Sequence, residues 1–144
     1  KLMSGLFGSK KVPKRPNPPG GEPIELLVGW GRPEPQVLNE KDVFVATKFA
    51  IKVADNAPKN ACLVRVACHL MIHEDDSQSQ TKWPVNLRPT TEGHGFSPEP
   101  DGTWTGTLTK DMRIVFEAES HPYPNIWTVS MQPTATRVGD WSDE

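Results

Sequence analysis

Proline and glycine are the residues that most restrict the fold of this chain, because 15 prolines and 11 glycines are spread over its 144 residues. Proline lacks a backbone donor and breaks the interior of a helix, and glycine favours turns. Regular elements should therefore be short. The length fits a single domain, because domains commonly contain about 100–150 residues.

The N-terminal segment has a composition of its own. Residues 1–20 carry five bases and no acid, a formal charge of +5, so the net charge of −2 leaves −7 for the other residues. A basic segment so rich in proline cannot bury enough apolar surface to offset the entropy of ordering it. We predict that residues 1–22 form a flexible, basic, proline-rich arm and that residues 23–144 form one β-rich globular domain.

Several stretches show the alternation of apolar and other residues that is typical of half-buried strands. They are residues 24–30, 43–53, 104–117 and 127–131. The last stretch follows a proline-rich turn and should pair with its predecessor as a hairpin. Gly106 interrupts the third stretch and predicts a bend or a bulge there.

Residues 61–73, with the sequence ACLVRVACHLMIH, fit two patterns. A repeat of two residues places most of the apolar side chains on one face of a buried strand. A repeat of 3.6 residues also gathers an apolar stripe, with Asn60 positioned to cap the start of a helix. We slightly favour the helix. The expected fold class is therefore α+β but mostly β, a compact antiparallel sheet or sandwich with one or two short helices.

Residues 77–102 show no clear periodicity and contain many glycines and prolines. Connections longer than ~12–15 residues are uncommon in compact domains unless they are functional or mobile. We therefore expect this region to be a contact loop.

Patterns for catalysis or metal binding are weak. His69 and His73 would share one face of a helix, as metal ligands do, but Leu70 stands where a His-Glu-x-x-His motif has its glutamate. On a strand the two imidazoles would lie ~13 Å apart. Cys62 and Cys68 fit neither a disulfide framework nor a four-ligand zinc site, and are expected to be reduced and buried. We expect no enzymatic activity, no cofactor and no bound metal.

Binding to a polyanion is the function that the arm suggests. Four of its five bases, Lys10, Lys11, Lys14 and Arg15, are suited to contact phosphates or anionic lipid head groups. No stretch approaches the ~20 apolar residues of a membrane-spanning helix, so any contact with a membrane should be peripheral. The competing interpretation is a tail that is merely solvated.

Several segments, in order along the chain, resemble the matrix proteins of rhabdoviruses. Residues 3–11, MSGLFGSKK, and the prolines after them are similar to the start of that family. Residues 40–58 resemble its first core strand and Asn-x-Pro exit, and residues 61–73 fall where it has a helix. Residues 105–127 are similar to a strand ending in an acidic turn and an Ile-Trp pair. The Pro-Pro-x-Tyr budding motif is absent, since two glycines follow Pro18 and Pro19.

The resemblance implies a viral structural protein of the matrix type, which self-associates and links the nucleocapsid to an anionic membrane in virion assembly. Its partners would be further copies of itself, the viral nucleocapsid or RNA, and the anionic membrane surface. It would occur in the virion, in the host cytoplasm and at the inner face of the host membrane. The alternatives are a small viral coat protein that binds genomic RNA through its basic arm, and a non-viral β-sandwich binding module. The residues expected at self-association contacts are Leu6, Phe7, Pro18, Pro19, Trp30 and Trp83, with Trp141 as a further contact candidate.

Overall fold

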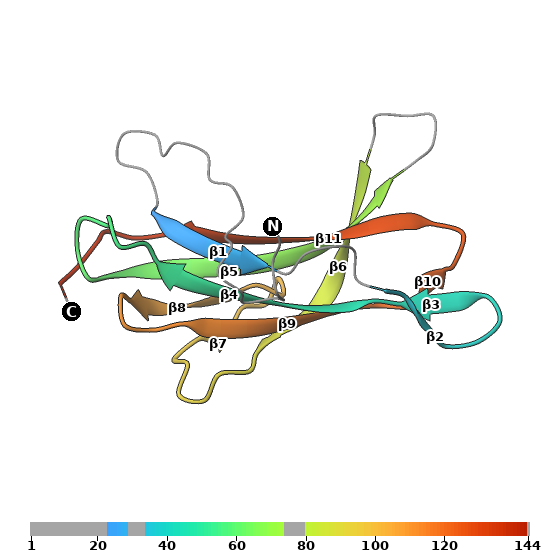
Figure 1. The fold of residues 1–144 in the computed structure, drawn as a ribbon, viewed down its shortest axis with the longest axis horizontal. Helices are drawn as coiled ribbons and strands as arrows, with labels where there is room; N and C mark the ends of the chain where they lie inside the picture. Colours follow the sequence, from blue (N-terminus) through green and yellow to red (C-terminus); the bar gives the residue numbers. More distant parts are fainter. Residues whose placement is uncertain (1–22, 29–33, 74–79, 144) are drawn as a thin grey trace, which may run out of the picture.

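A computed structural model describes residues 23–28, 34–73 and 80–143 of the chain. The predicted arm, with its bases and its self-association candidates, and Trp30 lie outside the described residues. The described part is mostly β, and none of it is helical (Figure 1). The one or two short helices that we expected are therefore not found there. The strands are β1 (Ile24–Val28), β2 (Gln36–Val37), β3 (Asp42–Phe44), β4 (Ala46–Val53), β5 (Ala61–His73), β6 (Gln80–Pro89), β7 (Ser97–Pro98), β8 (Trp104–Thr109), β9 (Ile114–Ser120), β10 (Tyr123–Pro124) and β11 (Thr128–Arg137).

The main sheet has the strand order β1-β4-β9-β6-β5-β8-β7, and every pairing in it is antiparallel. Strand β11 pairs with β5 along the edge that β6 and β8 leave open. A second, small antiparallel sheet has the order β10-β3-β2 and lies at one end of the molecule (Figure 1).

The strand β5 corrects our preference for a helix over residues 61–73. Its burial alternates along most of its length, with Val64 and Val66 buried and Leu63 and Arg65 exposed. Pairing along both edges satisfies its backbone donors and acceptors, and β-branched residues fit a pleated surface better than a helix. The helix that the family resemblance implied at these residues is likewise a strand here.

The strand β6 corrects the prediction of a contact loop over residues 77–102. Residues 80–84 pair with β5, whereas residues 85–89 pair with β9. The strand β6 therefore connects two parts of the main sheet, one with β1, β4 and β9 and the other with β5, β7 and β8. Pro84 is the last residue paired with β5 and lies at this change of partner. Proline has no backbone N–H to donate, so it is tolerated where a strand changes partner and is not paired along both edges.

The stretch 104–117 is two strands and not one, since β8 and β9 are separated by a turn and pair with different neighbours. Gly106 pairs in register with Val64, so the bulge that we predicted there is absent. The expected hairpin between β9 and the closing strand is also wrong, because β11 pairs with β5. The alternation of apolar residues identified strands correctly but did not identify their partners.

The core joins side chains from both parts of the main sheet. The largest fully buried side chains are Phe49, Ile51, Leu70, Leu108, Ile114 and Phe116, which come from β4, β5, β8 and β9. Phe49 stacks on Phe116 with ring centroids 5.6 Å apart, and Phe96 packs edge-to-face on Phe116 at 5.5 Å. The core therefore contains three phenylalanine rings in contact, with Phe116 between Phe49 and Phe96.

Candidate functional site

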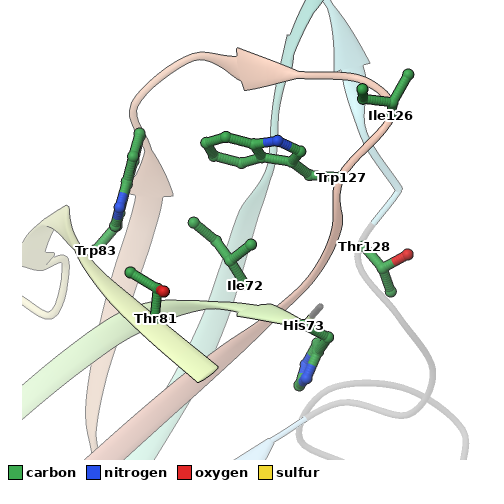
Figure 2. A pocket seen from close by; sticks show the side chains of 7 residues that line it. All are labelled: Ile72, His73, Thr81, Trp83, Ile126, Trp127 and Thr128. Atoms are coloured by element: carbon green, nitrogen blue, oxygen red, sulfur yellow. The ribbon is translucent and has the colours of Figure 1, made fainter. Parts of the chain in front are cut away.

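The candidate site is a pocket of about 480 Å³ at the end of the molecule where β5 meets β6 and where β11 begins. Figure 2 shows the indole rings of Trp83 and Trp127 beside Ile72, with His73 and Thr128 at the margin. The full lining is Ile72, His73, Thr81, Trp83, Ile126, Trp127 and Thr128. None of these described lining residues is acidic. The pocket is thus a mainly apolar depression with a hydroxyl- and imidazole-bearing rim, which is the usual composition of a binding site.

Aromatic contacts brace one wall of this pocket. Trp83 and Trp127 pack edge-to-face with their ring centroids 5.0 Å apart, and Tyr123 stacks against Trp127 at 6.2 Å. Tyr123 is almost completely buried, and this burial raises the pKa of its hydroxyl above its usual value. Aromatic pairs in these geometries add about 0.5–1.5 kcal/mol beyond the area that they bury. The wall is therefore preformed.

The polar part of the rim is also positioned by contacts within the fold. The Nε2 atom of His73 lies 2.9 Å from the hydroxyl oxygen of Ser130, and the two groups share a hydrogen bond. Ser130 belongs to β11, so this bond connects the margin of the pocket to the neighbouring strand. It fixes the orientation of the imidazole beside the apolar floor.

A group of exposed apolar side chains, which we call the apolar tip, lies next to the pocket. It consists of Val37, Leu38 and Ile126, which are 78%, 50% and 85% exposed. Ile126 is itself part of the pocket lining. The loop that carries Ile126 is held to the β2–β3 hairpin, because the backbone N–H of Asn125 donates to the carbonyl oxygen of Lys41 at 2.9 Å. The tip and the pocket thus form one surface.

The β2–β3 hairpin presents its part of this tip rigidly. The side-chain oxygen of Asn39 accepts hydrogen bonds from the backbone N–H groups of Lys41 and Asp42 at 2.8 and 2.9 Å. The backbone N–H of Leu38 donates to the carbonyl oxygen of Asp42 at 3.0 Å. An asparagine that closes a turn in this way is a common local device. Val37 and Leu38 therefore stand on an ordered turn.

Of the self-association candidates named from the sequence, the structure places Trp83 in the pocket. Trp141 lies elsewhere, half-buried near the end of the chain with the Arg137 guanidinium 5.8 Å from its ring centroid. Leu6, Phe7, Pro18, Pro19, Trp30 and the four arm bases fall outside the described residues. The structure thus brings one predicted residue into a site.

The histidine and cysteine candidates do not form a reactive centre among the described residues. His69 and His73 lie on strand β5, so the spacing of a strand separates them by ~13 Å. No group of three or more metal-ligating side chains occurs in the described part of the chain. Burial raises the pKa of the Cys68 thiol to about 12, so the thiol stays protonated at neutral pH and is a poor nucleophile.

Sequence reasoning missed most of the pocket. The sequence predicts Trp127 as part of a strand over residues 127–131 and of the Ile-Trp pair with Ile126, and Ile72 as a core position, but it assigns none of them to a pocket. The exposed Val37 and Leu38 lie between a Pro-x-Pro and an Asn-Glu pair, which indicates a turn but not its exposure. Their proximity to Trp83 depends on pairings between distant strands, which no local pattern reveals.

Comparisons with known proteins give no neighbour: no protein-family model matches the chain, and neither a curated protein nor a solved structure is significantly similar to it. In the described part of the chain, there is no helix that would be able to span a membrane.

Proposed function

We propose that this protein is a structural protein of the viral matrix type. In this proposal the β-rich body self-associates, and the basic arm contacts an anionic membrane surface or the nucleocapsid. The two parts of the main sheet would face one another across the core as a sandwich, which provides a rigid unit for assembly. The protein would act by binding and not by catalysis.

The observation that carries the proposal is the surface formed by the pocket and the apolar tip. Three aliphatic side chains exposed at one end of a small domain are costly in water, at about 25 cal/mol for each Å² of apolar surface. Exposed apolar side chains gathered at one end of a domain are typical of interaction sites. Trp83, named from the sequence as a self-association candidate, lines the adjoining pocket.

The charge distribution supports the second part of the proposal. Residues 1–20 of the arm carry +5 and the other residues of the chain carry −7. A basic segment on an acidic body is suited to bind a polyanion through the arm while the body is repelled from it. This separation favours a peripheral contact that salt weakens.

The experiment compares two pairs of substitutions in binding to anionic liposomes. Lys10→Gln with Lys11→Gln removes two charges from the arm, and Lys48→Gln with Lys59→Gln removes two exposed charges from the body. At about 1 kcal/mol for each base near an anionic membrane, the arm variant should bind about 30-fold more weakly. The body variant should bind nearly as well as the unmodified protein, because its two lost charges lie on a part of the chain that the proposal does not place at the vesicle surface.

Co-sedimentation with phosphatidylserine vesicles at low and high salt is the measurement, repeated with single-stranded RNA. Equal binding by both variants would refute a role for the arm. Binding to RNA but not to vesicles would replace the matrix proposal with the second candidate, a small coat protein whose arm binds genomic RNA.

A further inference from the structure

The β2–β3 hairpin and the aromatic pocket are both apolar, and the pocket is large enough to receive the side chains at the end of the hairpin. The hairpin presents Val37 and Leu38, which are more exposed than most apolar side chains of a folded domain. Their side chains contain roughly seven carbon groups, or about 200 Å³ at the ~30 Å³ that one water-sized group occupies. The pocket, at about 480 Å³, has room for both.

We propose that the apolar hairpin tip of one copy, with Val37 and Leu38, inserts into the Trp83–Trp127 pocket of a second copy. The inference rests on the self-association proposed above and names the two surfaces that make it. We call the end of the hairpin with Val37 and Leu38 the plug, and we call the pocket the socket. Every copy of the protein carries both.

The position of the plug beside the socket determines the symmetry of this contact. Tyr123 stacks on Trp127 in the socket wall, and its backbone pairs with Val43, which in turn pairs with Val37. Plug and socket are thus joined through one short sheet and cannot move apart freely. When two such surfaces are adjacent, a two-fold axis lets each copy insert its plug into the other, which gives a closed dimer.

A second copy fits the plug better than an anionic bilayer does. Residues 34–42 carry three acids, Glu34, Glu40 and Asp42, and a single base, Lys41, so the hairpin has a formal charge of −2. An anionic membrane would repel this hairpin. The described lining of the socket contains no carboxylate that would repel the acidic hairpin of a second copy.

Two variants disrupt the plug and the socket separately. Val37→Asp with Leu38→Asp charges the plug, and Thr81→Arg fills the socket from an exposed position. The matched controls are Val138→Asp, on the opposite end of the molecule after β11, and Thr107→Arg, on an exposed position of β8 (Figure 1). All five substitutions in these four variants lie at the surface, so unfolding midpoints should stay close to that of the unmodified protein.

Sedimentation velocity of the full chain at high salt is the measurement, because salt screens contacts made by the arm. The unmodified protein and both controls should dimerise with rising concentration. Each disabled variant should dimerise at least about 30-fold more weakly, since burial of the two aliphatic side chains is lost or blocked.

Mixing the two disabled variants is the decisive step. The Thr81→Arg chain still has a plug and the Val37→Asp, Leu38→Asp chain still has a socket, so a heterodimer keeps one of the two contacts intact, whereas the dimer of either variant with itself keeps neither. The mixture should therefore associate more tightly than either variant alone, although more weakly than the unmodified protein. Failure of the mixture to associate would overturn the plug-and-socket contact, as would dimers that persist in either variant.

Other outcomes separate this inference from the matrix proposal. If the plug variant dimerises normally but loses binding to vesicles, the tip is a lipid-inserting surface and the inference is wrong. If the dimer forms as described but the arm binds no anionic partner, the inference stands and the matrix proposal fails.

Discussion

Replacement of Gly106 by alanine is the sharpest test of the packing described here. A Cβ atom at this position would lie 2.7 and 2.8 Å from two atoms of the Phe96 ring and 2.9 Å from the carbonyl oxygen of Gly95. Carbon atoms in ordinary contact are about 3.5–4.0 Å apart. The ring or the strand must therefore move by nearly 1 Å.

The Phe96 ring has little room to move. It is 5% exposed and packs edge-to-face on Phe116, which stacks on Phe49 in turn. Overpacking of a core costs about 1–3 kcal/mol. Alanine regains about 0.4–1 kcal/mol by restricting the unfolded chain. We expect a net loss of about 1–2 kcal/mol in the free energy of unfolding, or roughly 3–7 °C in Tm for a chain of this size.

Gly139→Ala is the matched control, because its Cβ would meet only the Cβ of Leu63, at the ordinary contact distance of 3.7 Å. Urea unfolding followed by circular dichroism gives both free energies. Adding Phe96→Leu to Gly106→Ala should recover much of the loss, which a double-mutant cycle measures as a coupling energy. A Gly106→Ala protein as stable as the Gly139→Ala protein would refute the close approach of Phe96.

Two further predictions concern ionisable groups. The folded-state pKa of Cys68 is about 12 and that of an unfolded thiol is about 9, so the folded state binds the proton more tightly. Stability should therefore be unaffected below about pH 9 and fall between pH 9 and 12, by up to ~1.4 kcal/mol for each pH unit. Urea unfolding at about pH 8 and pH 10 should show a smaller fall in Cys68→Ala, and an equal fall would contradict the burial of this thiol. Arg88 and Glu117 form an exposed cross-strand ion pair, so Glu117→Gln should cost only about 0.2–1 kcal/mol, a loss that high salt should reduce. A cost well above that range in the same urea assay would show that the pair is not solvent-screened.

The sequence predicted buried positions correctly where buried and exposed side chains alternate along a strand. The alternation over residues 43–53 predicted the buried positions Val43, Val45, Phe49, Ile51 and Val53, and the structure confirms each of them. The same reasoning predicted the strand at residues 24–28 but not its most buried face, because Glu25 and Leu27 are buried whereas Ile24, Leu26 and Val28 are half-buried. The prediction over residues 43–53 succeeded because alternate side chains of a strand lie on the same face, and this face meets the core.

Prediction failed where tertiary contacts override the local pattern. The apolar residues within 61–73 would form a stripe on a helix and also one face of a strand. Only the pairing of β5 along both edges decides between helix and strand. Prolines 84 and 89 concealed β6, which tolerates Pro84 because the strand changes partner there. Gly106 suggested a bulge, but the side chain it makes room for belongs to Phe96, ten residues earlier.

Composition and periodicity alone determined that this chain is β-rich and that its charge is divided between a basic N-terminal segment and an acidic remainder. The expectation of short elements was wrong for β5, β6 and β11, which have 13, 10 and 10 residues. Only the tertiary structure decided which strands pair, and therefore that Trp83 meets Trp127 beside the β2–β3 hairpin. The physical reason is that alternation encodes which face of a strand is buried, a property of neighbouring residues. The pocket instead depends on contacts between residues more than forty positions apart. These contacts stabilise the chain only once the sheet has formed.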